Sequence, residues 1–273
     1  MNQAQIDYAA SLIGRIDSGE RGIFLDSVNT ATRVEAKIFP AGVFFASMFE
    51  KRLRIHIAFE EDTDAFNDEI ATLVRGSLKK ANSTSCVIWL WNGNRKIIAH
   101  LKDTFRITTE RDYASIEFIM HRENFHPTPN DTLEVRPYEK KHLFAYLNLL
   151  AHSMTFTNAP RYRRYPVSFA KGFAKYAKED AFEAFWKDGA LIGLYWRKGA
   201  EINTIAVADK HQRRGYGSII LTRALEMIFK RTHAPYAYLY AVDWNTKGQA
   251  FYKKYGMEQN GHSYQLNIEN YTE

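Results

Sequence analysis

The chain has 273 residues and a formal net charge of +6, and 45% of its residues are hydrophobic and 25% are charged. This composition is typical of a soluble globular protein with enough apolar residues for a core, and the length allows one large domain or two ordinary ones. No apolar run approaches the ~20 residues that span a bilayer, and the N-terminus lacks the basic-then-apolar pattern of a secretory signal. Cys86 is the only cysteine, which excludes an intrachain disulfide and leads us to expect a reducing, cytoplasmic location.

The first half predicts alternating helices and strands. Apolar residues at helical spacing predict helices over residues 3–17, 63–81 and 95–105. The apolar run that follows Cys86 predicts a buried strand, in which the thiol belongs to the core and is not a nucleophile. Alternating or apolar runs predict the strands of this half at 38–39, 43–49, 53–59, 85–91, 106–107 and 115–120.

A domain boundary is predicted at residues 126–131, His-Pro-Thr-Pro-Asn-Asp, because two prolines cannot continue a helix or a central strand. We therefore expect two α/β domains, one over residues 1–126 and one over residues 131–273. In the second, helices are predicted at 139–152, 215–231 and 246–255. Its strands are predicted at 133–136, 181–186, 190–196, 201–207, 236–242 and 262–268.

The net excess of positive charge is confined to the second half of the chain. Residues 131–273 carry 21 Lys/Arg and 14 Asp/Glu, whereas residues 1–130 carry 16 and 17. A polyanionic ligand or nucleic acid would account for this excess. A basic surface without any special role would account for it equally well, so the charge alone does not identify a partner.

The two halves repeat one order of elements. Strand 53–59, helix 63–81, strand 85–91 and helix 95–105 are echoed by strand 201–207, helix 215–231, strand 236–242 and helix 246–255. The lengths agree within a few residues, but the residues themselves barely match. Duplication of one fold, with the first copy degenerate, is one interpretation, and coincidence of a common order is the other.

A phosphate-binding loop is predicted where strand 201–207 passes into the next helix. The loop Gln212-Arg213-Arg214-Gly215-Tyr216-Gly217-Ser218 combines two glycines and two arginines at a helix N-terminus. Free N–H groups of a first helical turn and the helix dipole favour an anion there. Glycine has no Cβ and so lets a ligand approach the backbone closely.

Strand 201–207 breaks the alternation of a regular strand. Ile202 falls on one face, whereas Ile205 and Val207 fall on the other. A β-bulge near Asn203–Thr204 would repair the pattern and would free backbone groups for an extended ligand. The alternative is a strand buried on both faces, for which alternation matters little.

These features together resemble the GNAT superfamily of acyl-CoA-dependent N-acyltransferases over roughly residues 131–268. Its phosphate loop, Gln/Arg-x-x-Gly-x-Gly/Ala, is matched in full by Gln212–Gly217. Its later signature, an asparagine seven residues before a tyrosine, is matched by Asn245 and Tyr252. Met257 replaces the usual phenylalanine after Gly256, and Gly248 stands where a better helix former is usual. The resemblance implies a mixed central sheet of GNAT type, flanked by helices and preceded here by a second α/β domain, itself a possible degenerate relative.

The resemblance also implies site residues and a co-substrate, acetyl-CoA, without any metal. Tyr252 would protonate the departing thiolate of coenzyme A, and Glu201 would take the proton of the amine. Asn245 would bind the pantetheine arm or steady the acceptor. The remaining cofactor contacts would be the backbone of Ile205, Ala206 and Val207 for pantetheine, and Gln212, Arg213, Arg214, Gly215, Tyr216, Gly217 and Ser218 for the pyrophosphate.

The acceptor side of the predicted enzyme is less defined. Residues 154–178 interleave aromatic and basic side chains, where the resemblance implies a segment that covers the acceptor pocket. They could recognise an acidic or aromatic acceptor, stack on nucleic acid bases, or simply pack as amphipathic helices. We expect acetyl transfer to a small-molecule or peptide amine by direct attack, in a monomer or homodimer without membrane contact. The alternatives are a non-catalytic acyl-CoA-binding regulator and, with less support, an RNA-binding module.

Overall fold

The structure is a computed structural model that describes residues 2–16, 24–25, 27–29, 31–49, 52–107, 112–127, 132–154 and 159–271. The chain forms two compact units. Unit 1 comprises Met1–Phe118, Tyr240–Phe251 and Gln259–Glu273, and unit 2 comprises Ile119–Leu239 and Tyr252–Glu258. The predicted boundary at 126–131 lies partly outside the described residues, and the domain limits 1–126 and 131–273 stay a prediction.

Unit 1 contains a mixed sheet. Its strands are β1 (Thr32–Phe39), β2 (Gly42–Phe49), β3 (Arg52–Phe59), β4 (Cys86–Trp91), most of β11 (Glu258–Ile268) and most of β5 (Asp112–His121), in the order β1-β2-β3-β4-β11-β5. The first three strands pair antiparallel, whereas β3 and β4 pair parallel and are connected through helix α3. Strand β11, from the C-terminal end, pairs antiparallel with β4.

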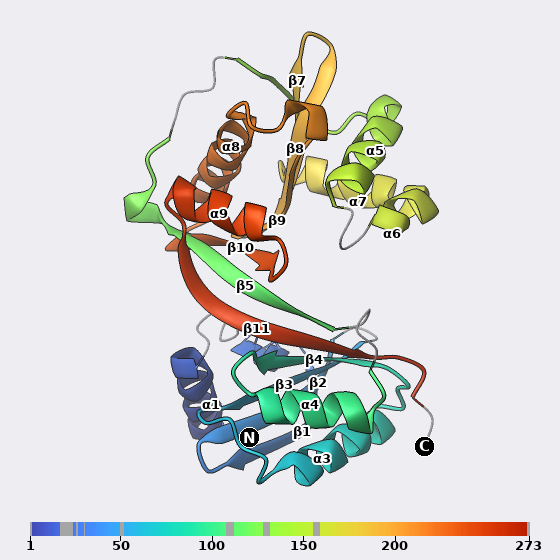
Figure 1. Cartoon of the computed structure of the whole chain (residues 1–273), viewed down its shortest axis with the longest axis vertical. Coiled ribbons are helices and arrows are strands. Elements are labelled where there is room, and N and C mark those ends of the chain that lie inside the picture. Colours follow the sequence, from blue (N-terminus) through green and yellow to red (C-terminus); the bar gives the residue numbers. More distant parts are fainter. Residues whose placement is uncertain are drawn as a thin grey trace. The chain divides into compact units, whose positions relative to one another are not determined.

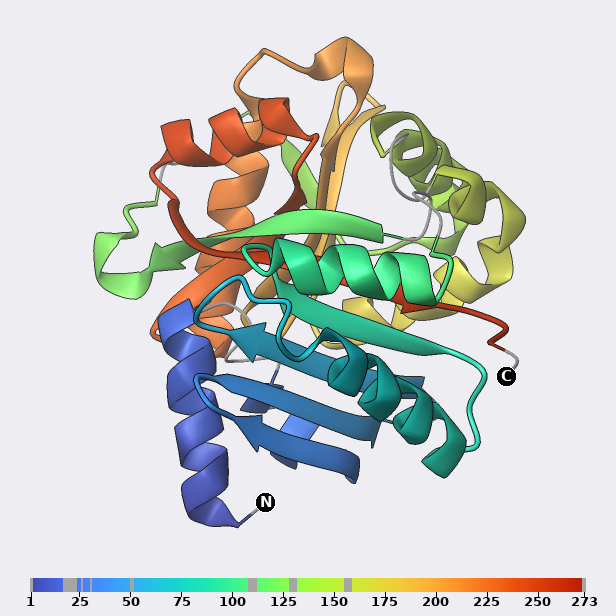
Figure 2. The same ribbon diagram turned by 60° about the horizontal axis from the view of Figure 1, so that its bottom comes forward.

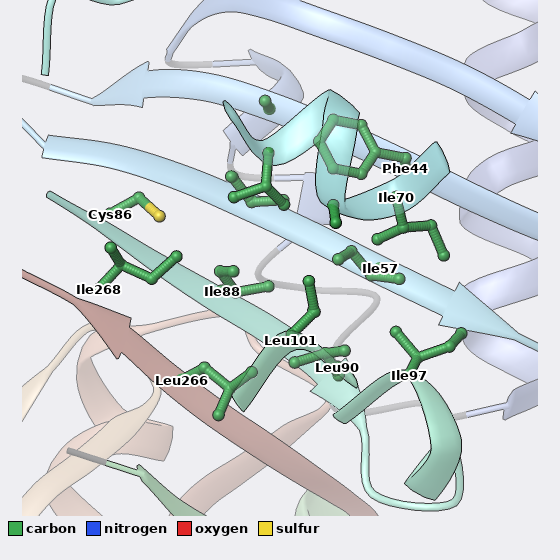
Figure 3. Packing of buried hydrophobic residues seen from close by; sticks show 14 of the residues in the cluster. Phe44, Ile57, Ile70, Cys86, Ile88, Leu90, Ile97, Leu101, Leu266 and Ile268 are labelled. Carbon is green, nitrogen blue, oxygen red and sulfur yellow. The ribbon is translucent and has the colours of Figure 1, made fainter. Parts of the chain in front are cut away.

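Helices cover both faces of this sheet. Successive side chains of a strand point to opposite faces, and here both faces present apolar side chains that the helices bury. Helices α3 (Asn67–Lys80) and α4 (Arg95–Thr104) pack on the face that presents Phe44, Ile57 and Ile88, as Figures 2 and 3 show. Helix α1 (Gln3–Ile16) packs on the opposite face, against Val43 and Phe45 of β2. The predicted position of Cys86 in the core is confirmed, since its side chain is buried in the same cluster and burial raises its pKa to about 12.

The strands of unit 2 lie in the order β10-β9-β8-β7-β6 and include both parallel and antiparallel pairs. These strands are β6 (Glu134–Arg136), β7 (Phe182–Lys187), β8 (Ala190–Lys198), β9 (Glu201–Val207) and β10 (Tyr236–Val242), the last of which ends in unit 1. Strands β6 to β9 pair antiparallel, and β9 pairs parallel with β10. The hairpin predicted around Lys187–Gly189 is confirmed, and Asp188 and Gly189 both take positive φ in its turn.

Helices flank this sheet on two sides. Helices α5 (Leu143–Ser153), α6 (Ala159–Arg164) and α7 (Pro166–Lys178) lie together on one side of β7 and β8, and α8 (Tyr216–Arg231) lies on the other (Figure 1). The first side is held by an aromatic core that includes Tyr146, Phe173 and Trp196. Helix α9 (Thr246–Tyr255) follows β10; it begins in unit 1 and ends in unit 2.

The predicted fold class is confirmed as mixed α/β, and most predicted elements are observed within a few residues. Four predictions need correction. The strand predicted at 38–39 is only the end of β1, which begins at Thr32. Residues 106–107 form no strand, because Arg106 takes a positive φ in a turn. The strand predicted at 262–268 begins at Glu258, because β11 continues through the polar residues before His262. The helix predicted from residue 139 begins at Leu143, after a short 3₁₀ turn at Lys140–His142.

Candidate functional site

The site lies on strand β9 and on the loop that follows it. A single pair, Tyr238↔Glu201, joins β9 to the part of β10 that belongs to unit 2, supported by a hydrogen bond from the Tyr238 N–H to the Ala200 carbonyl of 3.1 Å. Among the described residues of unit 2, the second half of β9 pairs with β8 alone. Within this unit, β9 therefore has backbone groups on one edge that no strand pairing uses.

Along an antiparallel strand, successive residues direct their backbone N–H and C=O groups alternately toward the partner strand and away from it. This alternation identifies the residues of β9 whose backbone groups point away from β8. The Ala208 N–H donates to the Ile192 carbonyl of β8 at 2.9 Å, so Ala206, two residues earlier, also directs its backbone toward β8. Ile205 and Val207 therefore direct theirs away from β8. The Val207 carbonyl accepts a hydrogen bond from the Gln212 side chain at 3.2 Å. Of the three predicted pantetheine contacts, Ile205 and Val207 present backbone groups to the edge, and Ala206 does not.

A β-bulge at Asn203 starts this free segment, as the alternation of the sequence predicts. Trp196 pairs with Thr204 and Arg197 pairs with Ile202, which leaves Asn203 without a partner on β8. Its exposed side chain is held in place by two hydrogen bonds. The Trp196 indole N–H donates to its Oδ1 at 2.7 Å, and its own amide donates to the Glu201 carboxylate at 3.1 Å. The bulge thus fixes the carboxylate predicted as the general base.

The surroundings of Glu201 make its carboxylate a stronger base than usual. Burial raises the pKa of Glu201, while the hydrogen bond from Asn203 and the charge of Lys198 act in the opposite direction. Tyr176 of α7 lies close enough for its charge state to be coupled to this carboxylate, since burial and then Glu201 raise its pKa. The Tyr176 ring stacks on that of Trp196, with centroids 6.3 Å apart. A half-buried carboxylate is therefore bordered by an aromatic pair and an amide.

The phosphate loop has the geometry predicted for an anion cradle. Gly215 caps α8 with a φ of 82°, in the left-handed region where glycine is favoured, and Arg213 also takes a positive φ of 64°. The loop is exposed from Gln212 to Gly215, and the first-turn N–H groups that follow have no carbonyl four residues earlier within the helix. The Gln212 side chain ties the loop to the end of β9 through the Val207 carbonyl and the Asp209 carboxylate.

Two residues beside this loop were not singled out from the sequence. Lys187, at the tip of the β7–β8 hairpin, places its ammonium 3.5 Å from the Tyr216 hydroxyl and 5.8 Å from the centre of that ring. The His211 Nε2 is buried and has no hydrogen-bond partner among the described residues. Burial, and then the charges of Lys210 and Arg214, lower the pKa of His211. Only the tertiary structure reveals them, because a hairpin lysine and a loop histidine have no distinctive local pattern.

Tyr252 is held as a neutral phenol near the end of α9. Its side chain is 9% exposed, and burial raises its pKa to about 12. Such a group keeps its proton at neutral pH and can donate it to a stronger base. The Tyr252 carbonyl accepts from the Met257 N–H at 3.0 Å where the helix ends at Gly256.

Asn245 occupies the start of α9. Its Oδ1 accepts a hydrogen bond from the Gly248 N–H at 3.0 Å, which satisfies a free donor of the first helical turn. Gly248 has a steric reason to be glycine, because a Cβ there would lie 2.4 Å from the Asn245 amide nitrogen. The residue that the sequence marks as a weak helix former thus makes room for the asparagine side chain.

These residues fit an extended, peptide-like ligand that ends in phosphates. The free edge of β9 offers backbone donors and acceptors, the loop that follows offers N–H groups and two arginines, and both belong to unit 2. Within the described ranges, no three His, Cys, Asp or Glu side chains gather to hold a metal ion. The same residues include no helix long and apolar enough to cross a membrane.

Comparison with known proteins agrees with this geometry. The family model described as acetyltransferase (GNAT) family matches residues 147–257, which confirms the resemblance drawn from the sequence. No curated protein matches the chain.

Solved structures share the fold at low identity. A Drosophila protein solved by X-ray crystallography has 10% identity and a TM-score of 0.65, over 99% of this chain and 98% of its own. A GCN5-related N-acetyltransferase from Kribbella flavida has 12% identity and a TM-score of 0.53, over 95% of each chain. Another from Sphaerobacter thermophilus has 10% identity and a TM-score of 0.52, over 84% of this chain and 77% of its own. At these identities the likeness concerns the fold alone.

Proposed function

We propose that this chain, which carries a GNAT acetyltransferase domain at residues 147–257, transfers an acetyl group from acetyl-CoA to a primary amine. The observation that carries the proposal is the free edge of β9 leading into the exposed loop Gln212–Ser218. Backbone groups of Ile205 and Val207 would bind the pantetheine arm as an added strand would, and Asn245 would support it. Arg213, Arg214, the N–H groups of Gly215, Tyr216 and Gly217, and the side chain of Ser218 would bind the pyrophosphate, since the Ser218 N–H already donates to the Gly215 carbonyl at 3.0 Å.

Acetyl-CoA would supply an activated carbonyl carbon, which forms a bond to the amine nitrogen as its bond to sulfur breaks. The protein must then handle two protons, one lost by the amine and one gained by the thiolate. No cysteine is available near β9 to carry the acetyl group, since Cys86 is buried in the core of unit 1. Direct attack by the amine is the route that the residues of the site support.

Glu201 would accept the proton of the amine. A protonated amine has no lone pair with which to attack, so a base must act first. Burial raises the pKa of Glu201 toward that of an amine, which makes the transfer less unfavourable than to an exposed carboxylate. Asn203 and Trp196 would keep the carboxylate oriented through the hydrogen bonds of the bulge.

Tyr252 would donate the second proton to the thiolate that leaves. Its phenol carries a proton at neutral pH, as that of an ordinary tyrosine does, and burial raises its pKa further, to about 12. The Val207 N–H, on the free edge of β9, would stabilise the negative charge that develops on the carbonyl oxygen.

Calorimetric titration with acetyl-CoA and a thiol-release assay against a panel of amines test the proposal. We expect one molecule of acetyl-CoA to bind per chain, and release of free thiol with at least one amine. Absence of binding at millimolar acetyl-CoA would contradict the proposal. Binding without turnover on any amine would instead favour a non-catalytic acyl-CoA-binding regulator.

A further inference from the structure

Helices α5, α6 and α7 form a segment without acidic residues. Between Glu139 and Glu179 the chain has no Asp or Glu, but it contains the eight cations Lys140, Lys141, Arg161, Arg163, Arg164, Lys171, Lys175 and Lys178. On α7, Lys171, Lys175 and Lys178 recur at helical spacing, and all three are exposed. Like charges four residues apart on a helix destabilise it by a few tenths of a kcal/mol. The stability of α7 therefore does not explain why three lysines lie on it at this spacing.

Five cations of α6 and α7 have no acidic partner within the described residues. Elsewhere in unit 2, Arg136 pairs with Glu134 and Arg231 pairs with Asp180, and in unit 1 Arg15 pairs with Glu60. No ion pair joins Arg163, Arg164, Lys171, Lys175 or Lys178 to any residue that the structure describes. A surface that concentrates uncompensated charge of one sign attracts ligands of the opposite sign.

Exposed apolar side chains belong to the same segment. Phe144 is 71% exposed, Tyr165 is 50% exposed and Val167 is 67% exposed. They are three of the five large hydrophobic side chains that are exposed among the described residues. Apolar groups beside unpaired cations favour a partner that has both acidic and apolar groups.

The segment borders the predicted base. Helix α7 buries Phe173 against β7 and β8, and this packing directs Tyr176 of the same helix toward Trp196 and Glu201. An acceptor whose amine reaches Glu201 would therefore have its remaining groups near α7. Lys171 and Lys175 lie on the helical turns that precede Tyr176.

We infer that the acceptor is an acidic polypeptide that presents a lysine side chain or an N-terminal amine to Glu201 while its acidic residues lie along α6 and α7. This inference rests on the proposed function. The 13 residues of α7 span about 20 Å, which an extended peptide covers with about six residues. A small amino acid could reach only one or two of these cations. Nucleic acid matches the charge, but its backbone has no primary amine to accept an acyl group.

Fluorescence anisotropy with labelled peptides tests the inference without any turnover. Two peptides of about seven residues contain one free lysine each, flanked in one by Asp and Glu and in the other by Asn and Gln. We expect the acidic peptide to bind ~10-fold more tightly at low ionic strength, and the difference to shrink as salt screens the charges. Lys171→Glu with Lys175→Glu should abolish the difference.

A matched control keeps the test specific. Lys79→Glu with Lys230→Glu makes the same change in net charge at exposed helical lysines outside the segment, and should preserve the preference. Acetyl-CoA affinity, measured in parallel by calorimetry, should not change in either double variant. Equal binding of the two peptides overturns the inference even if acetyl-CoA binds. Tighter binding of single-stranded RNA than of the acidic peptide also overturns it, and favours an RNA partner.

Discussion

Two segments of this chain follow the same order of elements, but only one of them keeps an open strand edge. In unit 2, β9 is joined to β10 by one pair at its start. In unit 1, β3 is joined to β4 by five consecutive parallel pairs from Leu53↔Cys86 to Ile57↔Leu90. Within its own unit, β3 is paired on both edges, whereas the second half of β9 is paired only with β8, so an extended ligand could add to β9 within unit 2 and could not add to β3 in the same way.

The loops after these strands differ in charge as well. Residues 60–66, which follow β3, include Glu60, Glu61, Asp62 and Asp64, and the first turn of α3 adds Asp68 and Glu69. The loop after β9 instead has Arg213 and Arg214 before a helix without acidic residues in its first turn. An acidic loop repels phosphate at the helix end where the basic loop attracts it.

In unit 1, Asn94 forms hydrogen bonds through its side chain with the backbone at the end of strand β3. Its side chain accepts from the Phe59 N–H and donates to the Phe59 carbonyl, each at 3.0 Å, and it is fully buried. It precedes α4 as Asn245 precedes α9, but Asn245 bonds to its own helix at Gly248. Seven residues later, unit 1 has the core residue Leu101 where unit 2 has Tyr252. A degenerate GNAT-like unit 1 remains our interpretation, and on this interpretation we expect only the segment with Tyr252 to bind acyl-CoA.

The largest expected effect concerns Tyr252. Tyr252→Phe should lower kcat at least ~100-fold, because a general acid contributes a factor of this order. The Kd for acetyl-CoA should change less than about twofold, since the ring still fills its buried position. Steady-state kinetics and calorimetry measure the two quantities. A large rise in Kd with little loss of kcat would assign Tyr252 to binding instead.

A smaller effect is expected from the charge of the loop. Arg213→Glu with Arg214→Glu should weaken acetyl-CoA binding ~50-fold, because each change replaces a charge-assisted contact with repulsion. The matched change in unit 1, Glu61→Lys with Asp64→Lys, should leave both the affinity and the stoichiometry of one per chain unaltered. A second binding event in the unit 1 variant would show that acidity alone, and not the closed strand edge, prevents binding there.

Removing the Asn94 side chain tests whether its hydrogen bonds to Phe59 or the pairing of β3 with β4 prevents acetyl-CoA from binding to unit 1. Asn94→Ala should lower the free energy of unfolding by about 2 kcal/mol, because the backbone N–H and carbonyl of Phe59 lose their buried partner. Urea denaturation measures this loss. The stoichiometry of acetyl-CoA should stay at one per chain, since five strand pairs still close β3 against β4. Asn245→Ala is the counterpart in the second segment, and it should affect acetyl-CoA affinity as well as stability.

The smallest expected effect is an acid sensitivity specific to unit 1. Burial, with the charge of Arg54, lowers the pKa of His56 to about 3, and its Nε2 lies 2.9 Å from the Ser27 hydroxyl. Because the unfolded chain takes up this proton near pH 6.5, the contribution of neutral His56 to stability is present above that pH. It decreases as pH falls toward 3, by about 1 kcal/mol between pH 6.5 and 5.5.

Urea denaturation at a series of pH values, with hydrogen exchange to localise the loss, measures this sensitivity. His56→Gln retains hydrogen-bonding groups but does not titrate, so its stability should depend less on pH over this range. An unchanged pH dependence in His56→Gln would assign the acid sensitivity to another group.

Sequence reasoning succeeded where the physical cause is local. The bulge at Asn203 follows from a break in alternation within one strand. The β7–β8 hairpin follows from its turn residues. The roles of Glu201, Tyr252 and Asn245 stay predictions, because a local pattern identifies candidates without testing their chemistry.

Partners distant in the chain could not be predicted in this way. Nothing local in residues 263–268 indicates that they pair with 86–91, because any strand edge of suitable pattern could accept them. The hydrogen bonds that hold Asn203 against Trp196, and the burial of Glu201 beside Tyr176, likewise depend on which elements pack together. The phosphate loop and the strand before it were thus determined by the sequence alone, since neighbouring residues dictate turns, bulges and helix ends. The pairing of β3 on both edges, and the pairing of the second half of β9 with β8 alone within unit 2, were decided only by tertiary packing, which sets which backbone groups are left without partners.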